Sequence, residues 1–385
     1  MSFVFTDSDF IYETKRKIKE KQDVWARIAR ELKYKADLAM EEEPLSITQV
    51  KSPAISGNPH DYFSEGPYWW PNPEDPDGPY IRRDGEYNPD RFDNHRNMIE
   101  QMSRTVLVLA QAGFFLDKPK YTKRAVKHIK VWFLNRATMM NPHIEYGQAI
   151  RGVCDGRGIG IIETRMLISV IHAAGFIAES GKFYKELAQL KKWFAKYLKW
   201  LNESEKGIEE REWFNNHAIW WTVQALSFAA FTDNKKIMVE CYDRYKNKII
   251  GEQLNADSAF EDELGRTRSY TYSLFSLHAC AVICEIAHTY GVDLWSYETE
   301  DGRSLKKSYE FIYPGFENSF TWKHQQLDLH GCFDESFGFQ LASLRFDKPE
   351  YEKANGVRRV DKYLVNTVSE LGSSALLPGF ACYKE

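Results

Sequence analysis

The hydrophobic positions along this chain recur mainly at intervals of three and four residues, which is the pattern of helices with one buried face. Trp193, Phe194, Tyr197 and Leu201 show this spacing clearly. The pattern predicts one or two helices within residues 8–42 and further helices over 97–114, 120–134, 163–179, 183–203, 216–231, 234–250, 269–290, 303–312, 335–344 and 357–371. We find no strong strand pattern and no fixed sequence repeat.

Short turns, several of them marked by glycine, separate these predicted helices. Consecutive helices joined by short turns run antiparallel, and such pairs suggest an α/α toroid whose inner helices line a cleft. We therefore expect an all-α protein, an incomplete barrel of about six to seven helix pairs with long irregular loops over the cleft. No linker divides the chain, so residues 1–385 are predicted to form a single domain.

Two irregular stretches interrupt the helical pattern. Residues 43–95 are rich in Pro, Gly, Asn, Asp and aromatic residues, and such a loop is either packed structure or a functional surface. Residues 141–162 contain a glycine-rich segment before a predicted helix, which can wrap an anion. This segment follows no predicted strand and lacks a phosphate-binding motif, so it gives little indication of nucleotide binding.

The composition is that of an ordinary globular protein, with 43% hydrophobic and 28% charged residues. Aromatic residues make up 15% of the chain, and their rings can form flat platforms for sugars as well as fill a core. The formal net charge of −4 argues against nucleic-acid binding, which requires a basic surface. A locally basic cleft for an anionic ligand is compatible with this charge.

Cysteine usage and the amino-terminal sequence bear on metal binding and location. The six cysteines form no CxxC pair, so a zinc ribbon is not expected and no disulfide framework is inferred. No apolar run approaches membrane-spanning length, and membrane insertion is therefore not expected. The first residues lack the basic and apolar blocks of a signal peptide. The chain is therefore either cytoplasmic or begins after a removed leader.

The first candidate site is formed by Asn215, Asn216 and His217, at the start of the apolar helix predicted over 216–231. Both asparagines are good helix N-caps. A helix N-terminus presents N–H groups and partial positive charge that suit an anion. The Asn and His side chains could also donate hydrogen bonds to a carboxylate. The alternative is that Asn216 only caps the helix and that His217 is a structural core histidine.

The second candidate site runs from Arg266 to Tyr272, at the start of the helix predicted over 269–290. Ser269 can cap this helix, and Arg268 and Tyr272 are four residues apart and share one face. Arg266 is expected in the preceding loop, from which it can fold back over the same cleft. Guanidinium neighbours stabilise a phenolate, so Tyr272 could take or give a proton. The alternative is a core tyrosine whose hydroxyl binds backbone.

Five motifs, in this order and spacing, resemble the alginate-lyase-type polysaccharide lyases: HDYFSEGPYWWPNP, PYIRRDGE, GRGIGIIETR, NNH and RTRSYTY. The resemblance spans roughly residues 58–280 and is strongest to polysaccharide lyase family 38, with family 5 more distant. It implies an α/α toroid that cuts a polyuronate, such as alginate or glucuronan, by β-elimination. The implied partner is an anionic polysaccharide. The family's usual setting implies a periplasmic or secreted protein, with a cytoplasmic location left open.

The resemblance also implies roles for individual residues. Asn216, His217 and Arg266 would hold the uronate carboxylate, and Tyr272 would take the C5 proton and then protonate O4. Arg268 remains an alternative to Arg266. The further substrate-binding residues that we expect are Tyr68, Trp69, Trp70, Arg82, Arg83, Gln148, Arg151, Arg157, Arg165, Asn215 and Arg268. Neither a metal nor another cofactor is required, because arginine already supplies a cation.

Other interpretations of these residues remain open. α/α toroids also host glycoside hydrolases, which use two carboxylates. The candidates for that role are Glu261, Asp262, Glu263, Asp334 and Glu335, although such a charge run is usually a solvated face. A non-catalytic polyuronate-binding protein is a third possibility. The arginines of the second irregular stretch could instead form internal ion pairs, and one of the two adjacent tryptophans could be buried.

Overall fold

The computed structural model describes residues 3–20, 23–83, 85–317, 321–327 and 337–352. These residues are mostly helical, which confirms the predicted all-α class. They form two compact units: unit 1 is the described part of residues 32–212, and unit 2 is the described part of residues 2–31 and 213–385. A single domain over residues 1–385 stays a prediction.

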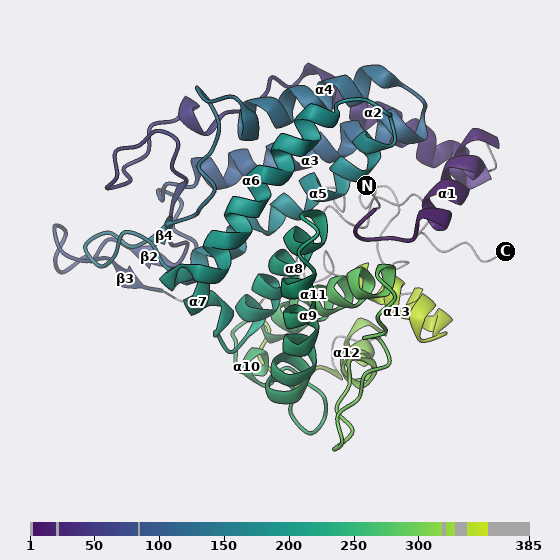
Figure 1. Ribbon diagram of the computed structural model, residues 1–385. Coiled ribbons are helices and arrows are strands. Elements are labelled where there is room, and N and C mark those ends of the chain that lie inside the picture. The colour runs from purple at the N-terminus through teal and green to yellow at the C-terminus, as the bar shows by residue number, and fades with distance from the viewer. Residues whose placement is uncertain (1–2, 21–22, 84, 318–320, 328–336, 353–385) are drawn as a thin grey trace. The chain divides into compact units, whose positions relative to one another are not determined.

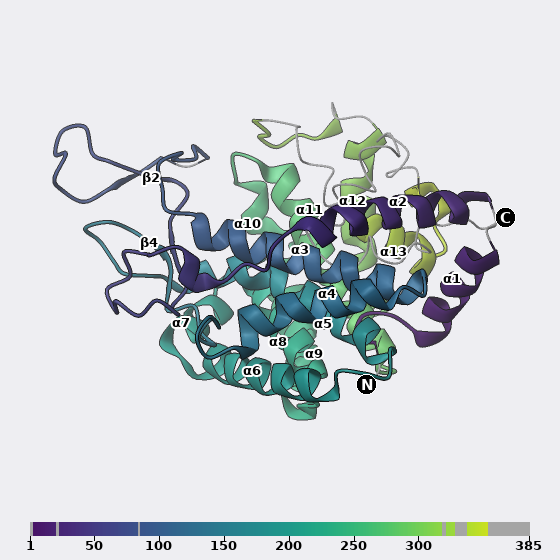
Figure 2. The same cartoon turned by 90° about the horizontal axis from the view of Figure 1, so that it is seen from above.

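Unit 1 is built around helix α3 (Asn94–Phe115), which packs against α4 (Pro119–Ile129) and α5 (Leu167–Ala178) (Figures 1 and 2). Buried side chains recur along α3 at intervals of three and four residues: Ile99, Met102, Val106 and Leu109. Proline is tolerated at the first position of α4 because that N–H has no partner within the helix. The remaining helical elements of the unit are η1 (Ile47–Gln49), the π-helix η2 (Lys130–Leu134), the 3-10 helix η3 (Gly158–Met166), α6 (Tyr184–Glu203) and α7 (Glu205–Arg211).

Two short pairs of strands complete unit 1. Strand β1 (Phe63–Glu65) runs parallel to β4 (Tyr146–Ala149), and β2 (Trp69–Trp70) runs antiparallel to β3 (Ile81–Arg82). Figure 1 shows β2, β3 and β4 at one end of the unit, and β1 lies there too because it pairs with β4. All of these strands fall within the two stretches that the sequence marked as irregular. The strands are too short to give the alternating pattern by which a strand is recognised in a sequence.

Unit 2 has α8 (Asn216–Phe231) and α11 (Ser269–Thr289) as its core helices. Every residue of α8 from position 218 onward is buried, as expected for a helix that lacks a polar face. The other helical elements are α1 (Ser8–Glu20), the first part of α2 (Asp23–Glu41), α9 (Lys235–Arg244), the π-helix η4 (Tyr245–Gln253), α10 (Glu261–Leu264), α12 (Leu305–Glu317), α13 (Phe337–Arg345) and η6 (Pro349–Glu352).

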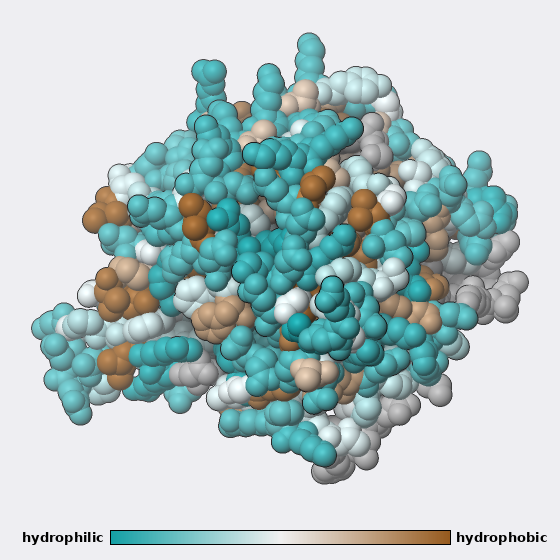
Figure 3. Space-filling model, turned by 60° about the horizontal axis from the view of Figure 1, so that its bottom comes forward, coloured by the Kyte–Doolittle hydropathy of each residue, from teal (hydrophilic) through white to brown (hydrophobic). Residues whose placement is uncertain are grey.

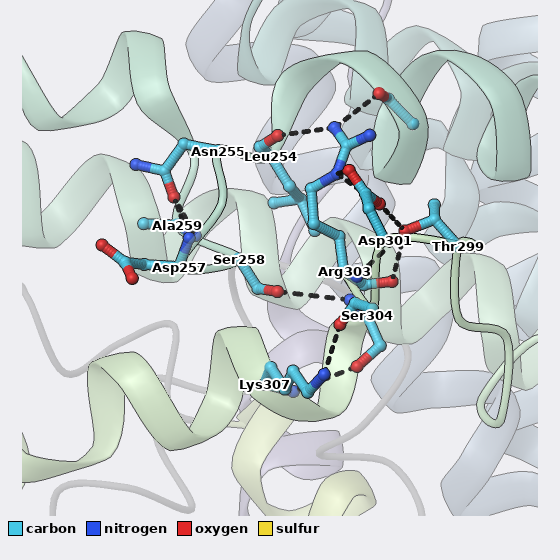
Figure 4. Close-up of polar contacts among 12 residues, drawn as sticks. Leu254, Asn255, Asp257, Ser258, Ala259, Thr299, Asp301, Arg303, Ser304 and Lys307 are labelled. Carbon is cyan, nitrogen blue, oxygen red and sulfur yellow. Dashed lines mark hydrogen bonds and ion pairs between the residues drawn. The ribbon is translucent and has the colours of Figure 1, made fainter.

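Arg303 holds the turn that precedes α10 in place (Figure 4). Its Nη1 donates to the carbonyl oxygens of Gly251 at 2.6 Å and Leu254 at 2.9 Å. The backbone N–H of Ser304 donates to the hydroxyl of Ser258 at 3.3 Å. Ser258 has a φ of +60°, which few residues other than glycine adopt. These bonds therefore fix the strained turn on which α10 rests.

Most predicted helices are present, with small shifts at their ends. The prediction over 216–231 coincides with α8, and the prediction over 269–290 differs from α11 by one residue. The sequence did not predict α7 or α10, because one or two turns are too short to show a helical period. It also did not predict that residues 158–166 form a 3-10 helix ahead of α5. The helix predicted over 357–371 lies outside the described residues, as does the start of the one over 335–344.

Among the described residues, two helical segments are long and apolar enough to cross a membrane, Gly158–Ala178 and Ser269–Thr289. The statement that no apolar run approaches this length was therefore wrong. In each segment 83% of the apolar window is buried inside the protein, so core packing explains its composition. The face of the molecule in Figure 3 is mainly hydrophilic, with hydrophobic residues in small separate groups. The absence of membrane insertion stays a prediction.

Candidate active site

Helix α8 begins with hydrogen bonds that occupy its first three backbone N–H groups. Asn215 is the N-cap, and its Oδ1 accepts from the N–H of His217 at 3.1 Å. The N–H of Asn216 donates to Glu263 at 2.7 Å, and that of Ala218 donates to the carbonyl oxygen of Asn215 at 3.1 Å. The expectation that this helix end offers free N–H groups to an anion was therefore wrong, because protein groups already bind them.

Glu263 is the anion at this helix N-terminus. Its side chain is buried, and its Oε1 accepts from both the backbone N–H and the Nδ2 of Asn216, each at 2.7 Å. The partial positive charge at the start of α8 favours a carboxylate in this position. The other oxygen, Oε2, lies 3.9 Å from Nη1 of Arg266, which makes a long ion pair. Glu263 thus connects α8 to Arg266, and treating it as part of a solvated charge run was wrong.

Arg266 and Tyr272 lie against each other. Arg266 follows α10 in the loop before α11, as predicted, and its Cζ lies 3.9 Å from the centroid of the Tyr272 ring. This is a close cation–π contact. Tyr272 is in the first turn of α11 and is only partly buried, which disfavours the alternative of a core tyrosine. The structure therefore provides the guanidinium neighbour that the sequence predicted for this phenol.

A ring contact between Trp220 and Phe275, with centroids 4.8 Å apart, packs α8 against α11. Trp220 is about one turn beyond Asn216, and Phe275 is about one turn beyond Tyr272. The contact thus brings the first turns of the two helices into the same region of unit 2. His217, also in the first turn of α8, is partly exposed. All four predicted catalytic residues therefore lie at or beside the starts of α8 and α11.

The start of α11 is held by a segment about 55 residues further along the chain. The hydroxyl of Ser269 donates to the carbonyl oxygen of Gln325 at 2.6 Å, so the prediction that Ser269 caps the helix was wrong. Arg268 occupies the cap position without a side-chain cap bond. The side-chain oxygen of Gln326 instead accepts from the N–H of Tyr270 at 2.9 Å. The N-terminal N–H groups of α11 are thus partly satisfied by a distant segment.

The predicted aromatic wall is a two-stranded hairpin in unit 1. Trp69 pairs with Arg82 across the strands, and the carbonyl oxygen of Tyr68 accepts from the N–H of Arg83 at 2.8 Å. The Cζ of Arg83 lies 5.0 Å from the centroid of Trp70. Both tryptophans are partly exposed, so neither is the fully buried one of the alternative interpretation. The hairpin therefore presents aromatic and cationic groups together.

Gln148 and Arg157 form a pair beside this hairpin. The Nε and Nη2 of Arg157 donate to the backbone and side-chain oxygens of Gln148 at 2.9 and 3.0 Å, and its Cζ lies 5.8 Å from the centroid of Trp69. Burial lowers the pKa of Arg157. Gln148 has a φ of +50°, a strained backbone conformation of the kind that gathers at functional sites. Because Arg157 binds the amide oxygen, Gln148 would offer a ligand N–H donors.

The other two predicted cations in unit 1 have internal partners. Arg151 donates from Nε to Glu65 at 2.5 Å, and this bond raises the pKa of the arginine. Arg165 donates from Nη1 to the carbonyl oxygen of Ile162 at 3.2 Å. The structural interpretation therefore accounts for both side chains. Arg151 remains 56% exposed and can also meet a ligand.

The glycines of residues 156–160 are required by close packing around β4. A Cβ on Gly156 would lie 2.2 Å from the carbonyl oxygen of Glu145, and one on Gly160 would lie 2.6 Å from the backbone of Gly147. Real Cβ atoms do not approach backbone this closely. The structure thus gives these glycines a packing role that needs no bound anion.

Sequence reasoning missed the structural role of three buried carboxylates that hold the candidate site residues, although Glu263 was named as a candidate hydrolase carboxylate. Glu263 binds Asn216, Glu65 binds Arg151, and Glu163 accepts from the hydroxyls of Tyr62 and Ser64 at 2.8 and 2.5 Å. The Ser64 hydroxyl in turn accepts from the N–H of Gln148 at 2.8 Å. Each of the three lies within three positions of a predicted site residue. That proximity was the one signal by which they could have been found.

Comparison with known proteins identifies the family of this chain. The alginate lyase family model matches residues 46–322. An alginate lyase from Bacteroides ovatus has a crystal structure that matches with a TM-score of 0.88 and 30% identity over 98% of each chain. Alginate lyase A1-III, as a histidine-to-alanine variant complexed with a tetrasaccharide, matches with a TM-score of 0.63 and 16% identity over 97% of this chain and 94% of that chain. The A1-III structure from Sphingomonas species A1 gives a TM-score of 0.54 and 14% identity over 82% and 87%. No curated protein sequence matches.

These findings define the protein as a helical polysaccharide lyase. The chain belongs to the alginate lyase family, because the family model covers well over half of it and a solved member matches along nearly its whole length. The predicted all-α toroid class is confirmed. The two A1-III matches inform the fold alone, since their identity to this chain is low. The finer resemblance to polysaccharide lyase family 38 rather than family 5 stays a prediction.

Proposed function

We propose that this enzyme cleaves a polyuronate by β-elimination at the start of helices α8 and α11. The polyuronate would be alginate, its mannuronate blocks, or glucuronan. The observation that carries the proposal is the contact of Arg266 with Tyr272 beside the Glu263-bound Asn216. It places a cation and a phenol together at the helix ends where an amide and an imidazole also lie. This combination suits β-elimination on a uronate, because a base must take the C5 proton while other groups neutralise the carboxylate.

The chemistry begins with the carboxylate next to C5. The C5 proton is weakly acidic while that carboxylate keeps its full negative charge. One N–H of the Asn216 side chain binds Glu263, so the amide contributes its second N–H to the substrate carboxylate. Arg266 and His217 add a cation and a ring N–H. Together these groups would stabilise the doubly anionic, enolate-like state that forms as the proton leaves.

Tyr272 acts as the base and then as the acid. Its phenolate oxygen takes the C5 proton, the C5–H electron pair becomes the C4–C5 double bond, and the C4–O4 bond breaks. The same hydroxyl then returns a proton to O4 of the leaving chain, which restores the phenolate. One product chain carries a 4,5-unsaturated uronate at its new non-reducing end. The other product, which lay on the non-reducing side of the broken bond, has a free reducing end. A positioned acid–base group of this kind contributes about 10²- to 10⁴-fold.

Hydrolysis by paired carboxylates has less support at this site. Glu263 is buried and bound to Asn216, and Glu261 accepts from Nδ2 of Asn255 at 2.7 Å. The candidates at positions 334 and 335 lie outside the described residues. A hydrolase needs one carboxyl that protonates a leaving oxygen and another that activates water. Glu261 and Glu263 instead have structural partners.

The experiment is incubation of the purified protein with polymannuronate, polyguluronate and glucuronan, while ultraviolet absorbance and chain length are followed together. β-Elimination produces the absorbance of the conjugated uronate in step with chain shortening, and the substrate with the highest rate identifies the preferred uronate. Chain shortening without absorbance would replace the lyase reaction with hydrolysis. Binding without shortening would leave a carbohydrate-binding protein. We also propose an exported location, which fractionation of the producing cells tests.

A further inference from the structure

Unit 1 has a cleft of about 710 Å³ that shares no residue with the candidate active site. Helix α4 forms one side of it, and Met40, Val131 and Phe183 contribute apolar surface. The volume is in the range of ligand pockets that hold a molecule of drug size. The accessible lining is mostly apolar, while its longer side chains end in charges. The cleft thus combines an apolar floor with a charged rim.

The charges at the rim are mainly positive and regularly spaced. Lys120, Lys123, Lys127 and Lys130 follow one another at intervals of three and four residues along α4 and the start of η2. These intervals correspond to roughly 5 Å along a helix axis. That distance is similar to the length of one sugar residue in an extended chain. A row of ammonium groups with this repeat matches a polymer that carries one carboxylate per sugar.

Three of these lysines pair with acidic side chains, beginning with Lys120 and Asp37 at 3.5 Å. Lys127 lies 3.5 Å from Glu43, whose side chain is 80% exposed, and Lys130 lies 3.6 Å from Glu186. Exposed pairs of this kind contribute little and exchange readily with other anions. Lys123 is exposed and makes no ion pair within the described part of the chain. The cleft is lined by five basic residues and by Glu186, and two further acids, Asp37 and Glu43, pair with these cations at the rim. Five basic residues against three acids leave two positive charges in excess.

The neighbouring His128 is buried next to these cations. Burial, and after it the charges of Arg124 and Lys127, lower the pKa of His128 to about 4, while the charge of Glu43 opposes this shift. A protonated imidazole is therefore disfavoured here mainly because the ring is buried.

We propose that the α4 cleft is a non-catalytic binding site for a segment of anionic polysaccharide of the class that the enzyme cleaves, an inference that rests on the proposed function. Sugar rings would lie over Phe183 and the aliphatic stems of the lysines, and uronate carboxylates would meet the ammonium groups. The concave shape excludes a flat lipid surface. The net charge of −4 disfavours nucleic acid as the occupant.

A second site for the same polymer would affect long and short substrates differently. A long chain bound at the cleft keeps its remaining sugars at high local concentration around the enzyme, so a lower concentration of polymer saturates it. A tetrasaccharide bound in the cleft gains nothing in this way. The proposal therefore predicts an effect on the KM for polymer that is absent for the tetrasaccharide.

The test uses the double variant Lys123→Gln with Lys127→Gln. The matched control is Lys192→Gln with Lys196→Gln, which removes the same charge from exposed positions of α6 outside the cleft. Binding is measured by native gel electrophoresis in gels that contain polymannuronate, with both pairs of substitutions placed on a Tyr272→Phe background to suppress cleavage. We expect the cleft variant to bind about three- to tenfold more weakly than the control variant.

Kinetics with Tyr272 intact provide the second readout. We expect the KM for polymer to rise about three- to tenfold in the cleft variant. Its kcat and its kcat/KM on a uronate tetrasaccharide should match those of the control. Equal polymer binding by the two variants would overturn the proposal, as would a loss of tetrasaccharide cleavage. The retardation test is repeated with DNA at the same molar concentration of negative charges. If DNA binds as strongly as polymannuronate and its binding also depends on the two lysines, the proposal is overturned, because the site would then accept any polyanion.

The binding assay separates this proposal from the proposed function. If no uronate is cleaved but retardation by polymannuronate still depends on the two lysines, the cleft site stands and the lyase reaction on that polymer fails. If cleavage proceeds and retardation is the same in both variants, the reaction stands and the cleft site is rejected.

Discussion

Asn216 donates two hydrogen bonds to the same oxygen of Glu263, one from its backbone N–H and one from its side-chain Nδ2, both at 2.7 Å. This arrangement fixes the amide plane of Asn216 at the first turn of α8. It also leaves the amide with one N–H for a substrate. Because Oε2 of Glu263 faces Arg266, one buried carboxylate orients two of the groups that we propose to bind the uronate.

Replacement of Glu263 tests this orienting role. Glu263→Gln keeps an acceptor oxygen for Asn216, so we expect kcat to stay within about tenfold of wild type. Glu263→Leu leaves the N–H groups of Asn216 without their buried partner and should lower kcat by about 10²-fold or more. Measurement of kcat and KM with thermal melting of each variant gives the comparison. Glu261→Gln, on the same helical turn, is the control and should be close to wild type.

The outcome that contradicts an orienting role is an equal loss of activity in Glu263→Gln and Glu263→Leu. Such a result would mean that the charge of Glu263, rather than its acceptor oxygen, is what the site requires.

Tyr272→Phe should keep the fold and lower cleavage by at least about 10²-fold, because the variant lacks the oxygen that accepts the C5 proton. Ultraviolet product formation and circular dichroism measure the two properties. The matched control is Tyr270→Phe, two residues earlier on the same helix. Its hydroxyl donates to the carbonyl oxygen of Ile312 at 3.3 Å, so activity should persist. An active Tyr272→Phe enzyme would remove this residue from the mechanism.

Arg266→Lys and Arg268→Lys decide which arginine neutralises the carboxylate. Arg266 lies against the Tyr272 ring, and Arg268 occupies the cap position of α11. A lysine keeps the charge but lacks the planar guanidinium. We therefore expect kcat to fall about 10²-fold in Arg266→Lys and less than about fivefold in Arg268→Lys. The reverse order in steady-state kinetics would assign the role to Arg268.

Trp69→Ala tests the hairpin as a substrate wall. The variant removes the ring that lies 5.8 Å from the Arg157 guanidinium and so removes a stacking surface. We expect the KM for polymer to rise about tenfold with little change in kcat, and Trp69→Phe to restore most of the affinity. A fall in kcat at unchanged KM would show that Trp69 supports the chemistry instead of binding.

Stability should depend on pH through His172, which is buried on α5. Burial lowers the pKa of this histidine to about 3, against 6.5 for an exposed one. His172 therefore binds a proton more readily in the unfolded chain than in the folded one. Its contribution to the free energy of unfolding is fully present above about pH 6.5 and is lost as the pH falls below that value. Between about pH 7.5 and pH 5 the loss from His172 should be about 2 kcal/mol.

Urea unfolding at the two pH values measures this effect. His172→Leu removes the titrating group, so the difference between the two unfolding free energies should shrink by about 2 kcal/mol whatever the variant's own stability. An undiminished difference would show that other groups cause the acid sensitivity.

Much of the chemistry could be predicted from the sequence because it depends on residues close together along the chain. The pair Asn216 and His217 stands at a helix start that the apolar run defines, and Arg266 lies six positions before Tyr272. A helix start and a short loop constrain such residues locally. The cation beside the phenol was predicted for this reason, and the structure confirms it.

The anchoring groups could not be predicted, because they come from distant parts of the chain. Glu263 binds a residue 47 positions away, and Gln326 satisfies the start of α11 from 56 positions away. The sequence shows three adjacent acids at 261–263 but does not show which of them turns inward. The four short strands escaped prediction in the same way, as did the identity of the carboxylate that pairs with Arg151.

The sequence by itself determined the helical class, the order of the long helices and the residue types that could do the chemistry, since apolar spacing and adjacent functional groups are local properties of a chain. Tertiary structure alone decided that a buried carboxylate occupies the helix end that the sequence predicted to be open to substrate. The physical reason is that burial removes water, and each buried N–H must then find its partner wherever the folded chain brings one.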